Sequence, residues 1–559
     1  MWERLNREVG GRLIKVQSPL NVCRDAPDGV ACGDLFRELK NPYYIGDQVG
    51  LTQTAGWVDA WTSRPSVYAV AAETTPDVVA AVNFARENNL RLVVKGGGHS
   101  YLGRSNAPDS LLIWTRHMSA TTLHDDFVPQ GCAAQQPPQP AVSVGAGAIW
   151  MHTYNQVTTK GGRYVQGGGC GTVGVAGLVQ AGGFGSFSKN FGTAAAGLLE
   201  AEIATADGAV RIANACTNPD LFWGLKGGGG GSLGVVTRLT LKTHELPPFF
   251  GAVFATIDAF SETAFRDLAG KFVDFYADNL LNPHWGETAT IRPGNRLDIR
   301  MVFQGIDQAQ AEAAWRPFFN WVTGSPQSFT YRLTPRIVAL PARNFWDPAY
   351  LKANVPGAVL SDDRPGASAD NIFWSGNLAE VGHFLSGFQS LWLPRSLLQA
   401  AARSRLADAL FAAGKHWSVE LHLQKGLAGG SHEAVSATSD TAMNPDVLDA
   451  FALAIIAGED PPAYPGLPSH EPDLAADRRH AEEITKAMGE LKRLAPDAGS
   501  YFAESDFFEA RWQTSYWGAN YPRLRSIKEK YDPGGLFFVH HGVGSEQWSP
   551  DGFTRLTAP

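Results

Sequence analysis

The sequence predicts an α+β fold with at least two domains. Its hydrophobic pattern runs strand, helix, strand between residues 67 and 95, whereas short alternating strands mix with helices between about 246 and 500. The chain has 559 residues, and one domain usually takes roughly 100–200. We therefore expect a first domain over residues 1–245, a second over 246–500 and a C-terminal segment over 501–559.

The first domain opens with a βαβ unit. Residues 67–72 have a strand pattern, 75–88 a helix pattern with a Thr cap, and 90–95 a second strand pattern. Glycine-rich loops follow at 96–103 and 161–192. The high glycine count, 60 residues, and the aromatic content of 11% fit a backbone that approaches a flat ligand closely.

A third glycine-rich loop contains a GxGxxG pattern at Gly229, Gly231 and Gly234. The pattern would indicate a Rossmann dinucleotide site if a helix followed it. The alternating segment VVTRLTLKT follows instead and predicts a strand. We therefore interpret this loop as bare amides that face a phosphate. Upstream of it, Asp207-Gly208 predicts the turn of a hairpin.

The second domain combines strands and helices. Residues 297–303 and 417–423 have strand patterns, and residues 472–494 have a helix pattern. From Tyr501 the chain is again rich in glycine, proline and aromatic residues.

Composition excludes several classes of function. The 47 Lys and Arg residues against 55 Asp and Glu give a net charge of −8, which excludes a polybasic nucleic-acid-binding arm. No apolar run approaches the ~20 residues of a membrane-spanning helix. We expect neither a nucleic-acid nor a membrane partner. There is no CxxC or HExxH motif, and the His540–His541 pair lacks further spaced ligands, so no metal site is predicted.

The sequence leaves the localisation open. The first residues, MWERLNREVGGRL, contain no apolar core of a signal peptide, although a signal could have been removed. Cys23 and Cys32 share a short loop-like stretch, which favours a local disulfide and an oxidising, secreted or periplasmic, compartment. Two free thiols fit the same spacing.

Two nucleophilic side chains stand alone in glycine-rich loops: His99 in KGGGHSYLG and Cys170 in QGGGCGTVGVAGLVQAGGFG. Taken singly, the histidine could cap a turn and the cysteine could be a small buried apolar residue. Together with the C-terminal stretch YWGANYPRLRSIKEKYDPGGLFF, they resemble the berberine-bridge-enzyme (BBE) branch of the vanillyl-alcohol-oxidase (VAO) flavoproteins. The resemblance covers most of residues 60–245 and 500–545.

The resemblance implies an FAD-binding domain of the p-cresol methylhydroxylase (PCMH) type, with its core at about 60–245. It also implies a substrate domain whose antiparallel sheet is covered by helices, and a BBE-like C-terminal segment that returns to the FAD-binding domain. The FAD would be bound covalently twice, by His99 at the 8α-methyl group and by Cys170 at C6. Imidazole and thiolate are suitable nucleophiles there, provided that neighbouring groups lower the thiol pKa.

Further residues are expected at the cofactor, mainly because glycine lets a backbone approach the diphosphate. They are Gly96, Gly97, Gly98, Ser100, Gly103, Gly169, Thr172, Val173, Gly174, Gly177, Gly182, Gly183, Asn520 and Tyr521.

Two candidate catalytic residues match family positions near the flavin. Tyr101 follows His99 by two residues and matches a family tyrosine at the reactive face, but it could equally be a packed aromatic residue. Glu504 stands where relatives carry a catalytic His or Tyr. It could act as a base if burial raises its pKa, or it could be a solvated acid on a loop.

The strand at 417–423 offers a second pair of candidates. Glu420, His422 and Gln424 share one face by period-two alternation. A polar face of an antiparallel sheet usually meets solvent, but in the resembled fold this sheet covers the flavin, so the face could line the substrate cleft. A strand at 449–456 occupies the place of a family base and offers only apolar residues after Asp449.

These features favour an FAD-linked oxidase that acts on an alcohol or phenol of a small-molecule substrate and passes electrons to O2. In the resembled family, the residue at the position of Val173 lies over the oxygen-reactive carbon of the flavin, where a small side chain admits O2. The alternatives are a dehydrogenase with another acceptor and a ligand-binding flavoprotein. Carbohydrates, lignols, polycyclic metabolites and alkaloids all fit an open, aromatic-rich cleft.

Overall fold

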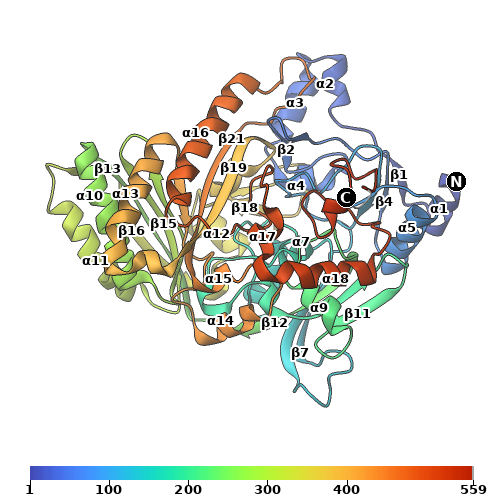
Figure 1. Ribbon diagram of the computed structural model, residues 1–559, viewed down its shortest axis with the longest axis horizontal. Helices are drawn as coiled ribbons and strands as arrows, with labels where there is room; N and C mark the ends of the chain where they lie inside the picture. Colours follow the sequence, from blue (N-terminus) through green and yellow to red (C-terminus); the bar gives the residue numbers. More distant parts are fainter. Residues whose placement is uncertain (557–559) are drawn as a thin grey trace.

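The computed structural model describes residues 1–556 and has the predicted α+β architecture (Figure 1). A first sheet has the order β1-β4-β6-β5, with bounds Leu13–Lys15, Tyr68–Ala71, Leu111–Trp114 and Leu92–Lys95. Strands β4, β6 and β5 run parallel. Helix α5 (Thr75–Glu87) begins after Thr74, whose capping box with Asp77 satisfies amides of the first turn. The predicted βαβ unit is confirmed.

A second sheet has the order β11-β10-β12-β8-β7, and β9 pairs with β12. The bounds are Val210–Asn214 (β11), Leu198–Ala204 (β10), Val235–Glu245 (β12), Gln139–Gly145 (β8), Thr121–Phe127 (β7) and Arg163–Val165 (β9). Strands β10 and β11 form the predicted hairpin around Asp207-Gly208. Strand β12 follows the third glycine-rich loop directly, so the loop is not a Rossmann turn.

The largest sheet has nine strands in the order β16-β13-β15-β14-β20-β21-β19-β2-β3. Strands β2 (Thr54–Trp57) and β3 (Trp61–Thr62) come from the N-terminal part of the chain, and β2 runs parallel to β19 (His383–Pro394). The other bounds are Phe329–Pro341 (β16), Phe249–Ala259 (β13), Arg296–Gln304 (β15), Trp285–Arg292 (β14), Val419–His422 (β20) and Ala450–Asp460 (β21).

Four helices cover one face of this sheet, as Figure 1 shows: α10 (Glu262–Phe275), α11 (Gln308–Thr323), α13 (Ala400–His416) and α16 (Leu474–Lys492). On β20, Val419 and Leu421 point into the apolar core beneath the helices. Glu420 and His422 therefore point the other way. The sequence predicted that β21 ends at Ile456, but the strand runs to Asp460, because its last pairs with β19 reach Glu459 and Asp460. That prediction was wrong by four residues.

The C-terminal segment returns to the first domain, as predicted. Helix α18 (Tyr521–Tyr531) packs beside α9 (Pro219–Leu225), and Phe537 forms a bridge with Leu92 of β5. Lys528 is buried and donates to the Ser232 carbonyl at 2.7 Å, the Phe537 carbonyl at 2.6 Å and the Asp532 carboxylate at 2.6 Å. This ammonium group joins the third glycine-rich loop to the C-terminal segment.

Shorter helices complete the described chain. Helix α1 (Trp2–Glu8) precedes β1, and helices α2 (Asn21–Asp25), α3 (Val30–Glu38) and α4 (Pro42–Asp47) lie between β1 and β2. Later ones are α6 (Trp150–Tyr154), α7 (Val175–Gln180), α8 (Ser188–Phe191), α12 (Pro348–Asn354), α14 (His432–Ser439), α15 (Asp446–Asp449) and α17 (Trp512–Trp517); β17 (Val359–Ser361) and β18 (Ile372–Trp374) form a small hairpin.

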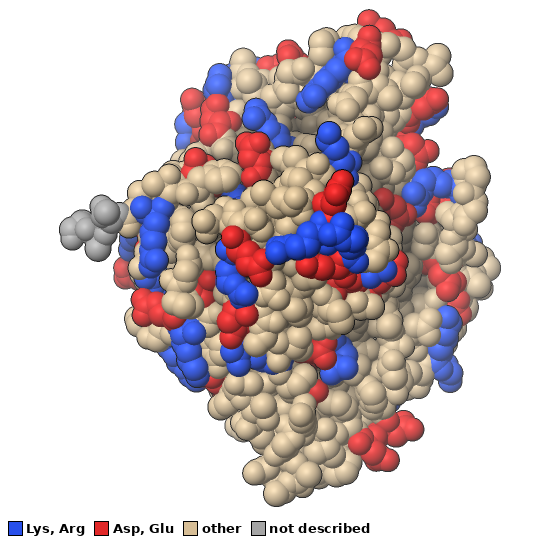
Figure 2. Space-filling model, turned by 90° about the vertical axis from the view of Figure 1, so that its right-hand side faces the viewer, with Lys and Arg blue, Asp and Glu red and all other residues tan. Residues whose placement is uncertain are grey.

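Two disulfides cross-link the first part of the chain. Cys23–Cys32 joins α2 to α3, which resolves the choice that the sequence left open, and Cys132–Cys216 links residues 84 positions apart. Figure 2 shows basic and acidic side chains interspersed on one face of the molecule. Among residues 1–556, no helix is both long and apolar enough to span a bilayer.

The first two glycine-rich loops cross at Gly97 and Gly174. A Cβ added to Gly97 would lie 2.7 Å from the Gly174 nitrogen and 3.3 Å from the Thr172 carbonyl oxygen. Both neighbours are backbone atoms, which cannot rotate away. The crossing therefore requires glycine and fixes the distance between the loops.

We expect Gly97→Ala to destabilise the protein by about 1–3 kcal/mol, since overpacking a close backbone contact has costs of this size. Gly489→Ala is the matched control, because an added Cβ there, in α16, meets no atom within 4 Å and lies away from both loops. The control should be neutral or slightly stabilising. Urea unfolding followed by circular dichroism measures both. Equal midpoints for the two variants would contradict the proposed crowding.

Candidate active site

A cavity of about 950 Å³ lies between the glycine-rich loops and the polar face of the nine-stranded sheet. The first loop (96–100), the second (168–174) and the third (230–234) form one wall. Strands β14, β20 and β21 contribute the opposite wall through Glu287, Glu420 and Glu459. The C-terminal segment adds Glu504 and Phe538. All three predicted parts of the chain thus meet at one site.

A buried lysine anchors the start of the first loop. Lys95 ends β5 and donates to the carbonyls of Val49 and Leu51, each at 2.7 Å. Burial lowers the pKa of Lys95 to about 7. Gly98 adopts φ +77°, where an L side chain would be strained, and its carbonyl accepts from the Gln53 amide at 3.0 Å. The loop that carries His99 therefore has a fixed path.

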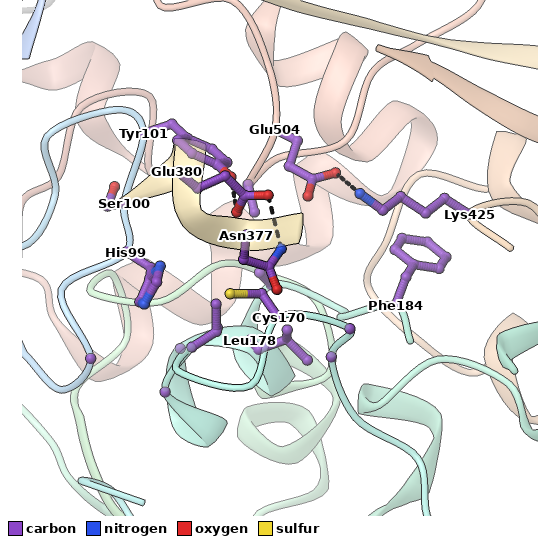
Figure 3. Close-up of a pocket in the computed structure, with 18 of the residues that line it drawn as sticks. His99, Ser100, Tyr101, Cys170, Leu178, Phe184, Asn377, Glu380, Lys425 and Glu504 are labelled. Carbon is purple, nitrogen blue, oxygen red and sulfur yellow. Dashed lines mark hydrogen bonds and ion pairs between the residues drawn. The ribbon is translucent and has the colours of Figure 1, made fainter. Parts of the chain in front are cut away.

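His99 and Cys170 meet at a shared neighbour, Thr172. The Thr172 hydroxyl oxygen lies 3.1 Å from His99 Nε2 and 3.7 Å from Cys170 Sγ. Both nucleophiles line the cavity, and the close-up places them on its lower side (Figure 3). Two loops that are about 70 residues apart in the sequence thus present an imidazole and a thiol to the same space.

Burial shifts the pKa values of the two nucleophiles in opposite directions. It lowers the pKa of His99 to about 3, so the imidazole is neutral and nucleophilic at physiological pH. Burial, together with the Glu380 carboxylate, raises the pKa of Cys170 to about 12, although hydrogen bonds from Thr172 and Val173 oppose this shift. We expected neighbours that lower the thiol pKa. Thr172 and Val173 act in that direction, but burial and Glu380 outweigh them.

The first loop also fits the anionic part of FAD. The amides of Gly97, Gly98, His99 and Ser100 donate to no group within residues 1–556, and all four residues line the cavity. Consecutive free amides favour a bound anion such as a diphosphate. The residues present therefore fit the cofactor that the sequence predicts.

Figure 3 shows two glutamates above the nucleophiles, Glu380 and Glu504, each in contact with polar neighbours. The Tyr101 hydroxyl donates to Glu380 Oε2 at 3.4 Å, and Asn377 Nδ2 donates to Glu380 Oε1 at 3.1 Å. Lys425 Nζ forms an ion pair with Glu504 Oε2 at 2.6 Å. Glu504 is thus neither a solvated acid nor an isolated one.

Burial, followed by the Glu459 carboxylate, raises the pKa of Glu380 to about 7, against the Asn377 hydrogen bond and the Lys425 charge. Burial and the neighbouring carboxylates hold the pKa of Tyr101 well above its usual value, so its phenol stays protonated. Glu380 is the residue of this pair that can exchange a proton near neutral pH.

The polar face of β20 lines the cavity. Glu420 Oε2 lies 3.3 Å from His422 Nε2. Burial would raise the pKa of Glu420, but the contact with His422 lowers it. His422 Nδ1 and Gln424 Oε1 are buried and have no partner within the described chain. Such orphaned polar atoms are suited to bind polar groups of a substrate.

Sequence reasoning missed Glu380 and Glu459. Glu380 ends a short 3₁₀ helix (Ser375–Glu380) that no motif marks. Glu459 lies beyond the predicted end of β21 and contacts His383 Nδ1 at 2.8 Å. Strand β21 therefore does bring a carboxylate to the cavity, although near the end of the strand and not at the apolar positions 450–456.

Six residues expected at the cofactor do not line the cavity: Gly103, Thr172, Gly182, Gly183, Asn520 and Tyr521. Thr172 still contacts both nucleophiles. Gly103 packs against the Trp61 ring and Gly182 against Met443. The Asn520 side chain donates to the Met443 carbonyl, and the Tyr521 hydroxyl to Glu546, so both residues hold the C-terminal segment in place. The other expected residues, from Gly96 to Gly177, lie at the cavity wall.

The sequence matches two known protein families in the regions that build this site. Residues 66–214 match the FAD binding domain family, and residues 500–544 match the family described as berberine and berberine like. The chain is 30% identical to FAD-linked oxidoreductase penH of Penicillium thymicola over 99% of this chain and 92% of that protein. It is an FAD-linked oxidoreductase of the VAO/BBE family. The predicted resemblance is confirmed.

A further relative and two solved structures are also similar to this FAD-linked oxidoreductase. VAO-type flavoprotein oxidase VAO615 of Thermothelomyces thermophilus is 27% identical over 99% of this chain and 92% of its own length. The crystal structure of VAO-type flavoprotein MtVAO615 from Myceliophthora thermophila has a TM-score of 0.77 at 24% identity, covering 98% and 95% of the two chains. Glucooligosaccharide oxidase from Acremonium strictum has the same fold, with a TM-score of 0.65 at 19% identity over 94% and 99%.

Proposed function

We propose that this oxidoreductase is an oxidase with bicovalently bound FAD, which oxidises a hydroxyl or phenol group of a fairly bulky substrate. The substrate would be a carbohydrate or an aromatic secondary metabolite, and O2 would be the electron acceptor. The proposal rests on one observation: the Thr172 hydroxyl contacts both His99 and Cys170, so the two side chains lie close together. Glucooligosaccharide oxidase from Acremonium strictum carries a 6-S-cysteinyl, 8α-N1-histidyl FAD, which needs the same two residue types.

The cavity supports a bulky substrate. Aromatic side chains, including Phe184, Trp346 and Phe388, line it beside the polar face of β20. A flat or cyclic substrate can stack on the aromatic rings, while His422 Nδ1 and Gln424 Oε1 bind its polar groups. When bound, FAD would supply the redox chemistry, a two-electron exchange between the substrate and O2.

The covalent linkage is tested by acid precipitation of the holoenzyme. The wild-type pellet should stay yellow, because two bonds retain the flavin. His99→Ala and Cys170→Ala should each keep one bond, and only the double variant should release FAD into the supernatant. Glu504→Gln, which alters the cavity without touching either nucleophile, is the control and should retain its colour. Free flavin from the wild type would refute the linkage.

The removal of the substrate hydroxyl proton is assigned to the Tyr101–Glu380 pair. Glu380, with a pKa of about 7, accepts a proton at neutral pH, and Tyr101 positions the carboxylate through its hydroxyl. The Lys425–Glu504 ion pair lies beside them. Glu504, Glu420 and His422 are the alternatives that the sequence suggested.

Glu380→Gln should slow flavin reduction by ~10²–10⁴-fold, the usual cost of losing a general base. In the wild type, reduction should become faster as pH rises through about 7, because only the ionised carboxylate accepts a proton. The variant should lose this rise. Stopped-flow reduction under anaerobic conditions measures both. If Glu504→Gln shows the larger defect and Glu380→Gln keeps the pH profile, the base is Glu504.

Val173 supports O2 as the acceptor. It lines the cavity beside Cys170, and its side chain is smaller than Leu or Ile by one methylene. Val173→Leu should therefore slow reoxidation of the reduced flavin in air and leave reduction by substrate nearly unchanged. Peroxide release and flavin absorbance measure the two half-reactions. A reduced wild-type flavin that persists in air-saturated buffer would indicate a dehydrogenase.

A further inference from the structure

A second polar cluster lies outside the cavity, where α16 packs on the ends of β19 and β21 (Figure 1). It consists of Asp460 at the end of β21, Asp477 and His480 on α16, and Ser386 in β19. None of these residues lines the flavin site. Asp477 and His480 are three positions apart and so share one face of the helix.

The three titratable residues can each offer one ligand atom, and these atoms lie within 4.8 Å of one another. Ser386 Oγ is within hydrogen-bonding distance of all three, at 2.9 Å from Asp477 Oδ1, 3.1 Å from Asp460 Oδ2 and 3.5 Å from His480 Nδ1. A hydroxyl has a single hydrogen, so it can donate to only one of them at a time. This hydroxyl alone therefore cannot satisfy both carboxylates.

No lysine or arginine of the described chain neutralises the carboxylates of this cluster. Asp477 is 2% exposed, and its Oδ2 has no hydrogen-bond donor within the described chain. No Lys or Arg among residues 1–556 forms an ion pair with Asp460 or Asp477. Arg478 pairs with Asp59, and His416 and Lys486 pair with Glu483. A buried carboxylate is costly unless a proton or a cation neutralises it.

We propose that Asp460, Asp477 and His480 bind one divalent transition-metal cation, for which Zn²⁺ is the probe. Two carboxylate oxygens and one imidazole nitrogen, with water in a fourth position, form a suitable ligand set for Zn²⁺. Ca²⁺ and Mg²⁺ prefer oxygen ligands only. Burial and the adjacent Asp460 carboxylate raise the pKa of Asp477, which makes a shared proton the competing occupant.

The bound cation would tie α16 to the end of β21. Asp460 directly follows Glu459, which lines the cavity and contacts His383. A cation at this position therefore fixes the end of β21 from the side opposite the active site.

Isothermal titration of the EDTA-treated, dialysed holoenzyme with ZnCl₂ at pH 7.5 tests the proposal. Wild type should bind one equivalent, and its thermal midpoint should rise on addition of Zn²⁺. Asp477→Asn and His480→Gln should each weaken binding by roughly 100-fold or more, since even changes around metal ligands cost ~10–100-fold. CaCl₂ and MgCl₂ should bind more weakly than ZnCl₂.

Glu482→Gln is the matched control, because it removes one exposed charge from the same helix and should bind Zn²⁺ like the wild type. The titration is run without reductant, so that Cys23 and Cys32 stay bonded and cannot bind metal with His470, whose Nε2 lies 3.3 Å from Cys32 Sγ. If Asp477→Asn does not fold, His480→Gln decides. Equal affinity in the wild type and the ligand variants overturns the proposal and leaves the two carboxylates sharing a proton.

Discussion

The close approach of Gly97 to Gly174 is the constraint on which the active site depends. It brings two loops, each following a different sheet, to backbone contact. Because the two backbones touch at this crossing, His99 and Cys170 lie near each other on the cavity wall, with Thr172 between them. Lys95 below the first loop and Tyr154, whose hydroxyl donates to the Gly168 carbonyl at 2.9 Å, hold the two loops in this relation.

The opposite wall has a different electrostatic character. Glu380, Glu459 and Glu504 come from three separate elements, and Lys425 forms an ion pair with only one of them. Crowding of carboxylates in a partly buried space favours the protonated form of one of them. The result is a neutral wall that presents an imidazole and a thiol to the cavity, facing an acidic wall that suits proton transfer.

The sequence predicted the wall formed by the glycine-rich loops better than the opposite, acidic wall. His99, Cys170 and the glycines stand in contiguous motifs whose composition reflects a local backbone requirement, so the loops could be recognised without a structure. Glu380 lies in a short 3₁₀ helix without periodicity, and its environment arises from residues far apart in the chain. Glu459 was missed because the apolar run of β21 stops before the strand does. The role of Asn520 in holding Met443 depends on tertiary contact alone.

Strands β2 and β3 connect the two halves of the molecule. They precede the FAD-binding core in the sequence but extend the sheet of the substrate domain through β19. Moving the halves apart would therefore either break this hydrogen-bonded ladder or stretch the few residues between β3 and β4. That short link limits how far the two halves can separate, because an extended residue spans only about 3.3–3.6 Å.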